Sequence, residues 1–311
     1  MIDSQILVTG GAGFIGSHVV DALVAAGRVP RIFDMEPSAF YAPADVDTYL
    51  GELGDPDALV DAMTGCGTVL HLAAIADVSE VALDPAWAEN VNARGTLNVL
   101  EAARAAGVGR VVYASTIWVY NGLDGPPVGE DATLPLPTHL YTATKLAGEM
   151  YCTSYAELYG LEYTILRFGI PYGPRARPAA VVPQFVSRAL AGEPLTIAGS
   201  GEQSRRFVYV EDLAKGCVAA LAPQAACRIY NLVGTEDTSV RQIADTVAAL
   251  VGDVDIVHTE ARLGDFRGVE VSPSRAAHEL GWEVEVAFEE GVSRYLAWHR
   301  ATHADLTTRS E

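Results

Sequence analysis

Tyr141 and Lys145 stand four residues apart, so on a helix the phenol and the ammonium would lie on the same face. A phenol with its pKa near 10 is a poor base at neutral pH, but a nearby positive charge favours the phenolate. Thr116 follows an apolar run typical of a buried strand, and its hydroxyl could orient an alcohol for that base. A surface tyrosine beside a surface lysine would give the same spacing. Thr116 favours the interpretation of Tyr141 as a proton-transferring group.

Three glycines follow the first apolar run and precede a helical pattern: Gly10, Gly13 and Gly16. Glycines let the backbone turn tightly and approach a pyrophosphate, whose charge is met by the amide groups of a helix N-terminus. A merely structural turn is the alternative, but the order of strand, glycine loop and helix favours a dinucleotide site. We expect this turn, with Phe14 and Ile15 inside it, to bind the dinucleotide.

Asp34 lies 18 residues beyond Gly16, at the end of the second predicted strand. A carboxylate at about this spacing accepts hydrogen bonds from the adenosine ribose and would repel a 2′-phosphate. The four residues that follow Asp34 include no Lys or Arg. NAD is therefore favoured over NADP, while the alternative is that Asp34 only caps the strand end.

These residues need elements to position them, and the first half of the chain alternates β-branched runs with Ala/Leu-rich helical stretches. We predict strands at 5–9, 31–34, 68–72, 110–114 and 163–168, and helices at 17–26, 57–63, 85–105 and 141–159. This pattern indicates an α/β fold, a doubly wound parallel (Rossmann) sheet with helices on both faces.

The second half of the chain predicts a smaller, interleaved C-terminal substrate-binding lobe. A loop near residue 169 precedes a helix at 182–191, strands at 207–210 and 229–232 would return to the sheet, and a helical lobe would begin near 240. We assign 1–168 plus about 207–232 to the NAD-binding domain, about 169–206 plus 233–299 to the second lobe, and 300–311 to a frayed tail.

Composition excludes several classes of protein. The 311 residues are 50% hydrophobic, which argues against disorder, and the formal net charge of −19 disfavours nucleic acid as a partner. No apolar run is long enough to span a membrane, and the N-terminus does not resemble a signal peptide. The four cysteines show no metal-ligand spacing, so we expect no metal and reduced core cysteines in a cytoplasmic protein.

The chain resembles the extended short-chain dehydrogenase/reductase family, in particular its NAD-dependent sugar-nucleotide epimerases and dehydratases. The stretches that carry this resemblance are 9–16 (TGGAGFIG), 71–74 (HLAA), Asn92 with 95–102 (GTLNVLEA), Thr116, Tyr141, Lys145, 172–174 (YGP) and 205–212 (RRFVYVED). By this resemblance the charge beside Tyr141 comes from Lys145 and the nicotinamide, and the substrate is a UDP-sugar.

The resemblance also implies roles for residues that the spacing alone does not single out. Asn92 would be the fourth member of the active site, although a buried amide satisfied by backbone is compatible with the same position. The adenine would meet Glu52 and Leu53, with Glu52 departing from the usual Asp. Leu72, Ala73 and Ala74 would line the cofactor cleft.

A basic stretch marks the expected diphosphate site. Residues 167–206 include six arginines and two glutamates, a balance of 6 − 2 = +4 within an acidic chain. The resemblance aligns Arg205 and Arg267 with diphosphate-binding arginines, whose planar guanidinium suits phosphate. We interpret Arg188 and Arg206 as ordinary surface charge.

Ile117 and Trp118 stand where related dehydratases have acidic residues. Without an acid or base to drive elimination, a sugar oxidised at C4 can only be reduced again, which favours 4-epimerisation. A plain dehydrogenase with net redox turnover would share Thr116, Tyr141 and Lys145. A non-catalytic member would usually have lost Tyr141 or Lys145.

The prediction of which sugar the protein binds depends on Arg177. It lies two residues after the YGPR element, as in UDP-glucuronate 4-epimerases, where the resemblance places it against the C6 carboxylate. A diphosphate or surface arginine is the alternative. Ile170 replaces a polar residue usual before YGP, so sugar contacts there must differ. We expect UDP-glucuronate and UDP-galacturonate, with UDP-glucose and UDP-galactose as the alternative pair.

The same resemblance suggests a homodimer built from the helices at 85–105 and 141–159. Their apolar content is equally expected of helices that pack on a sheet.

Overall fold

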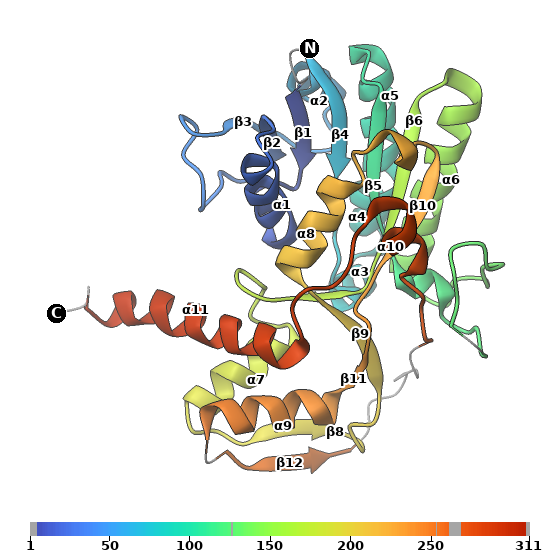
Figure 1. Cartoon of the computed structure of the whole chain (residues 1–311). Coiled ribbons are helices and arrows are strands. Elements are labelled where there is room, and N and C mark those ends of the chain that lie inside the picture. The colour runs from blue at the N-terminus through green and yellow to red at the C-terminus, as the bar shows by residue number, and fades with distance from the viewer. Residues whose placement is uncertain (1–4, 126, 253, 261–268, 309–311) are drawn as a thin grey trace.

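The computed structural model describes residues 5–125, 127–252, 254–260 and 269–308, and Figure 1 shows two lobes of unequal size. The larger lobe is built on a sheet of seven strands in the order β10-β6-β5-β4-β1-β2-β3, with every pair parallel. The strands are β1 (Gln5–Thr9), β2 (Pro30–Asp34), β3 (Asp47–Leu50), β4 (Cys66–His71), β5 (Arg110–Thr116), β6 (Glu162–Phe168) and β10 (Arg228–Leu232).

Successive side chains of the strands point to opposite faces of the sheet and pack into two separate hydrophobic cores. Leu7, Val69 and Val111 belong to the core under one set of helices, whereas their neighbours Val8 and Leu70 belong to the other. One face carries α1 (Phe14–Ala25), α8 (Val210–Ala219) and α10 (Ser274–Leu280), and the other carries α2 (Pro56–Met63), α5 (Gly95–Ala106) and α6 (Leu140–Tyr159). The predicted doubly wound α/β fold is confirmed.

The direction of strand succession reverses between β1 and β4, which are neighbours in the sheet. In open α/β sheets, ligands bind in the crevice at the carboxyl ends of the strands on either side of such a switch point. The predicted glycine loop follows β1 and the predicted 72–74 segment follows β4, so both lie at this crevice.

The smaller lobe, at the bottom of Figure 1, has two small sheets. One has the order β11-β9-β7 and the other pairs β12 with β8. Its elements are β7 (Ile170–Tyr172), α7 (Val181–Leu190), β8 (Leu195–Ala198), β9 (Ser204–Tyr209), β11 (Asp237–Ser239), α9 (Val240–Val251), β12 (Ile256–Thr259) and α11 (Phe288–Thr308).

Several sequence predictions about elements were wrong. The strand predicted at 207–210 does not join the large sheet, because β9 pairs with β7 and β11. The tail predicted to be frayed, 300–311, is helical through Thr308, where α11 ends, and 309–311 lie outside the described residues. The helix predicted at 85–105 is interrupted: α4 (Pro85–Glu89) is followed by a π-helix over Asn90–Arg94 and then by α5.

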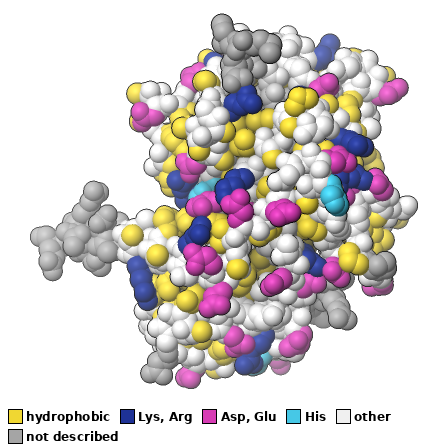
Figure 2. All heavy atoms as spheres, in the orientation of Figure 1, with side chains coloured by type: hydrophobic (Ala, Val, Ile, Leu, Met, Phe, Trp, Pro, Cys, Tyr) yellow, Lys and Arg dark blue, Asp and Glu magenta, His cyan; other side chains and the backbone are white. Residues whose placement is uncertain are grey.

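Two further findings concern single features. Cys227 is exposed and has a positive φ of 55°, so the expectation that all four cysteines are core residues was wrong. Within the described ranges, no helix is both long and apolar enough to cross a membrane. Figure 2 shows acidic side chains spread over one face of the molecule, with basic ones between them.

Candidate active site

The N-terminus of α1 presents unpaired backbone amides to the crevice. Gly13 is the N-cap, no side chain caps this helix, and its first turn contains no acid. A helix start with these features leaves several N–H groups and a partial positive charge for an anion. The arrangement suits a diphosphate.

The glycines of this turn serve two purposes. A Cβ on Gly10 would lie 2.8 Å from the Ala73 amide nitrogen, and one on Gly16 would lie 2.0 Å from the Gly10 carbonyl oxygen. These two glycines are therefore required by the packing of the protein itself. A Cβ on Gly13 would meet only the Gly10 carbonyl oxygen, at 3.3 Å. The open side of Gly13 is the place where a ligand could approach the backbone.

Asp34 ends β2 beside the glycine loop. Its carboxylate accepts hydrogen bonds from the Ala12 amide at 2.9 Å and from the Met35 amide at 2.8 Å. The carboxylate thus does cap the strand end, and it lies against the same loop that faces the crevice. Glu52 is exposed just beyond β3, whereas Leu53 is buried in the core beneath it.

The 72–74 segment lies directly against the glycine loop. Leu72 donates its amide to the Thr9 carbonyl at 3.2 Å, and the Ala73 amide donates to the Thr9 hydroxyl at 3.3 Å. Ala74 is half-buried in the same segment. Small side chains here leave the crevice open between β1 and β4.

Thr116 and Tyr141 are brought together from β5 and α6. Burial raises the pKa of Tyr141 to about 12, while the charge of Arg177 and a hydrogen bond with Thr116 act to lower it. In the protein without a bound nicotinamide, desolvation outweighs the nearby charge. The structure brings the Thr116 and Tyr141 side chains into contact.

Lys145 lies one turn after Tyr141 and is buried against Tyr113. Its Nζ is 5.0 Å from the centroid of the Tyr113 ring. Burial lowers the pKa of Lys145 to about 8, and the charge of Glu149 opposes this shift. Arg177, rather than Lys145, is the cation whose charge acts on the Tyr141 phenol.

Asn92 lies in the π-helix and joins two parts of the site. Its side chain accepts from the Ile75 amide at 2.8 Å and donates to the Ile75 carbonyl at 3.0 Å. It also donates to the Thr144 hydroxyl at 3.2 Å, and that hydroxyl donates to the Tyr141 carbonyl at 2.8 Å. Asn92 therefore fixes the first turn of α6 relative to the segment after β4, and π-helical turns are frequent at functional sites.

A buried ion pair behind the catalytic residues was not singled out from the sequence. Arg167 donates to both oxygens of Glu149, at 3.0 and 2.7 Å, and Ser115 donates to the same carboxylate at 2.5 Å. Glu149 follows Lys145 by four residues, a spacing that could have indicated a shared helix face. These contacts join α6, which carries Glu149, to β5 and β6, which carry Ser115 and Arg167. Loss of either ion-pair partner would leave a buried, uncompensated charge.

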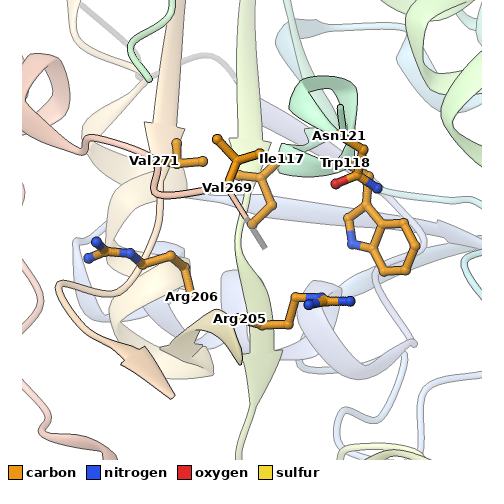
Figure 3. A pocket seen from close by; sticks show the side chains of 7 residues that line it. All are labelled: Ile117, Trp118, Asn121, Arg205, Arg206, Val269 and Val271. Atoms are coloured by element: carbon orange, nitrogen blue, oxygen red, sulfur yellow. The ribbon is translucent and has the colours of Figure 1, made fainter. Parts of the chain in front are cut away.

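A small cavity lies beside Thr116. It has a volume of about 10 Å³ and is lined by Ile117, Trp118, Asn121, Arg205, Arg206, Val269 and Val271. In Figure 3 the Arg205 guanidinium points toward the indole of Trp118, whereas the Arg206 guanidinium points the opposite way. Arg267 lies outside the described residues, and Ile170 is half-buried in β7.

The arginines of the basic stretch at 167–206 are largely neutralised by acids, most of them from elsewhere in the chain. Arg206, which we had interpreted as surface charge, is buried and forms ion pairs with Asp237 at 3.0 Å and Glu270 at 2.9 Å. Arg188 pairs with Glu193 at 3.5 Å. The local excess of arginines is therefore not a free positive patch.

Arg177 is half-exposed and forms an ion pair with Asp77 at 2.8 Å. The charge of its guanidinium acts to lower the pKa of the Tyr141 phenol. A half-exposed cation that influences Tyr141 is compatible with a role toward the substrate.

The crevice fits NAD. The open side of Gly13 and the uncapped start of α1 would hold the diphosphate, and Asp34 would hold the adenosine ribose. Tyr141 and Lys145 lie where the nicotinamide end would reach. When bound, NAD supplies an acceptor for hydride.

The fold is that of a Rossmann enzyme, and its candidate catalytic set is a tyrosine, a lysine and a threonine. Residues 6–232 match the NAD dependent epimerase/dehydratase family, and the chain belongs to this family. Its cofactor is NAD, as Asp34 predicted.

Similar proteins of this family include several sugar-nucleotide enzymes. The UDP-glucose 4-epimerase of Mycolicibacterium smegmatis is 34% identical, over 94% of this chain and 98% of that protein. The UDP-glucuronate 4-epimerase of Thermodesulfobacterium geofontis is 31% identical, over 94% and 95% respectively.

Two solved structures are similar throughout. The UDP-glucose 4-epimerase of Thermotoga maritima with UDP-glucose has a TM-score of 0.91 at 33% identity, covering 96% of this chain and 99% of that one. The Thermus thermophilus UDP-glucose 4-epimerase in complex with NAD has a TM-score of 0.87 at 34% identity, covering 95% and 99%.

Proposed function

We propose that the protein is a 4-epimerase of a nucleotide sugar. The observation that carries this proposal is the pair of residues after Thr116: Ile117 and Trp118 have no carboxylate, and the other described residues that line the small cavity beside them have none either. A dehydratase or decarboxylase route needs a further step after oxidation at C4, and Ile117 and Trp118 offer no group to promote elimination. These two residues therefore support re-reduction of the 4-ketone.

In the proposed cycle, Tyr141 takes the proton from O4 of the sugar while Thr116 holds the same hydroxyl by hydrogen bonding. The hydride from C4 would be accepted by bound NAD and, once the ketose has rotated in the site, returned to the opposite face of C4, while Tyr141 would give its proton back to O4. The positive charges of Arg177 and of the oxidised nicotinamide would offset the burial that raises the pKa of the phenol. Net redox change is zero, so the same cofactor molecule serves every turnover.

We further propose that the sugars are UDP-glucuronate and UDP-galacturonate. Arg177 supports this choice because its guanidinium lies near Tyr141 and is half-exposed, so it could form a bidentate contact with a C6 carboxylate. Such a contact would also hold the carboxylate out of alignment with the C4 carbonyl, which matters because a carboxylate β to a ketone can leave as CO₂. UDP-glucose and UDP-galactose form the competing pair.

The first prediction is that Arg177→Ala selectively weakens turnover of the acidic sugars, about tenfold or more in kcat/KM, or lets CO₂ and a UDP-pentose appear. Wild type and variant would be incubated with UDP-glucuronate, UDP-galacturonate, UDP-glucose and UDP-galactose, and the products identified by NMR. Faster epimerisation of UDP-galactose than of UDP-galacturonate, unchanged by Arg177→Ala, would contradict the carboxylate contact. Accumulation of NADH would indicate a dehydrogenase instead.

We also propose that the chain forms a homodimer through the side that carries α3 (Val78–Leu83), α4 and α6. Large apolar side chains are exposed on these neighbouring elements. They are Leu83, Trp87, Met150, Leu158 and Tyr159.

A further inference from the structure

Residues 173–177, which we call the strap, connect the two sides of the cofactor crevice. They follow β7 of the smaller lobe, yet two of their arginines form ion pairs with the larger lobe. Arg175 pairs with Asp21 on α1, the helix after β1. Arg177 pairs with Asp77, six residues beyond the end of β4.

The anchor on α1 consists of several contacts. Arg175 Nη1 lies 2.8 Å from Asp21 Oδ2, and its guanidinium lies 4.1 Å from the centroid of the Phe40 ring. The Tyr41 hydroxyl donates to the other oxygen of Asp21, and His18 Nε2 lies 2.9 Å from the Pro174 carbonyl oxygen. The strap, α1 and the loop after β2 are thus joined around one carboxylate.

The backbone at this anchor is unusual. Arg175 has a φ of 66°, in the left-handed region that non-glycine residues seldom adopt. Such a conformation persists when its surroundings hold it, and it is found at ligand clamps and switch regions. The Arg175 side chain contacts Asp21 and Phe40, and the Ala176 amide donates to the Gly173 carbonyl within the same turn.

The second anchor lies at the other side of the crevice. Asp77 is the N-cap of α3, where its Oδ1 accepts from the Ser79 amide at 2.8 Å. Its Oδ2 lies 2.8 Å from Arg177 Nη1, so one carboxylate both starts the helix and fixes the strap. The guanidinium of Arg177 and the hydrogen bonds from the start of α3 keep the pKa of this carboxyl below its usual range, although its partial burial acts to raise it.

The positions of the anchors place the strap across the crevice. β1 and β4 are adjacent at the switch point of the sheet, and the two anchors lie on the segments that follow these two strands. A dinucleotide on the α1 N-terminus with its nicotinamide at Tyr141 would pass between them. We propose that the strap is a retention device, which must detach from Asp21 or Asp77 before the dinucleotide can leave or enter.

This inference rests on the proposed redox-neutral function, in which the cofactor need not leave between turnovers. The ion pairs join protein to protein, so they form whether or not the dinucleotide is bound. They should therefore slow both release and uptake, whereas a residue that merely contacts the cofactor would mainly change release. The ratio of the two rates distinguishes the two roles.

The test measures cofactor exchange without any sugar. Holoenzyme loaded with radiolabelled NAD would be mixed with excess unlabelled NAD and sampled by rapid gel filtration, and uptake would be followed with the cofactor-free protein. Asp21→Asn and Asp77→Asn remove one charge each while keeping a hydrogen-bonding side chain, and Asn is a good helix N-cap. Arg175→Asn is a third variant, since Asn tolerates a positive φ better than most residues.

The matched control is Asp245→Asn, which removes the same charge from an ion pair within α9, where Arg241 lies 3.0 Å from Asp245. We expect each strap variant to accelerate release and uptake by about two- to fivefold, the double variant Asp21→Asn/Asp77→Asn by about tenfold, and the control not to change either rate. Unchanged exchange rates in the strap variants, or faster release of NAD without faster uptake, would contradict the proposed role of the strap. Faster exchange in a protein that epimerises none of the sugars would refute the proposed function and leave the strap in place.

Discussion

Tyr141 is surrounded by groups that act on its phenol in opposite directions. Burial raises the pKa of this residue to about 12, and the charge of Arg177 and the hydrogen bond with Thr116 oppose the rise. A base that is protonated at neutral pH needs help at the moment of reaction, and the cation that NAD brings to the site can give it. In the proposed mechanism Tyr141 would therefore act as a base only with cofactor and substrate bound.

At the residue scale we predict that Tyr141→Phe lowers kcat by about 10² to 10⁴, the usual range for general acid-base catalysis, while the protein still folds and retains NAD. Thr116→Val should cost less, because it removes the orienting hydrogen bond and leaves the proton acceptor. Turnover would be measured by NMR of the sugar and retained NAD by absorbance after denaturation. Normal turnover by Tyr141→Phe would require a different base.

The sequence predicted this catalytic set, but it could not predict the state of the arginines near it. Thr116 ends a strand, and Tyr141 and Lys145 lie at the start of a helix. The local sequence pattern predicts both elements, and it therefore predicts that these three residues share one edge of the sheet. Arg206 is different: it is buried by Asp237 and Glu270, which are 31 and 64 residues away in the chain. These ion-pair partners can be identified only from the three-dimensional structure.

At the element scale, the local pattern predicted most strands of the large sheet, but it missed β3, α8 and α10 and could not decide which strands pair. β3 has four residues, none fully buried, and its apolar content is too small to distinguish it from a loop. The strand at 204–209 was expected in the large sheet, yet it pairs with β7 and β11 in the smaller lobe. Strand partners depend on the chain path, which periodicity does not encode.

His71 connects β4 to β1 and α5, and it leads to a prediction about stability and pH. Its Nδ1 lies 2.7 Å from the Thr9 hydroxyl and its Nε2 lies 3.1 Å from the Thr96 hydroxyl. Burial, with the charge of Lys145, lowers the pKa of His71 to about 3. In the unfolded chain the same imidazole has an ordinary pKa near 6.5.

Between these two values the unfolded state binds more protons, so the free energy of unfolding falls as the pH drops below about 6.5. From pH 7 to 5.5 the contribution of His71 should be about 1 kcal/mol of lost stability. Urea unfolding of wild type and of His71→Gln at both pH values would measure it, and the variant should lose less on acidification. Equal losses would mean that His71 does not remain neutral in the folded protein.

At the scale of the whole molecule, the chain passes repeatedly between two lobes and closes a crevice with segments distant in sequence. The strap at 173–177 follows the sixth strand of the large sheet along the chain and binds elements that come after the first and fourth. The sequence identified its YGPRAR pattern and gave no sign of Asp21 or Asp77 as partners. The proposed retention of the cofactor would therefore depend on contacts that only the folded chain forms.

The last prediction concerns the assembly of two such molecules. Met150 and Leu158 on α6 are 65% and 69% exposed, and Leu83 on the neighbouring α3 is 86% exposed. Exposed apolar side chains grouped on adjoining helices mark an interaction surface more often than scattered single ones do. In the proposed homodimer they would pack against their counterparts on a second copy. Light scattering coupled to gel filtration should give twice the monomer mass for wild type.

Met150→Lys and Leu158→Glu should weaken the dimer at least about tenfold, because each places a charge where an apolar contact is expected. Val24→Lys is the matched control, since this side chain is 50% exposed on α1, far along the sheet from α6, and its replacement should leave the mass unchanged. A monomeric wild type, or a dimer that resists both substitutions, would place the contact elsewhere. The catalytic residues all come from one chain, so a monomeric variant that still epimerises would show that assembly serves stability and not chemistry.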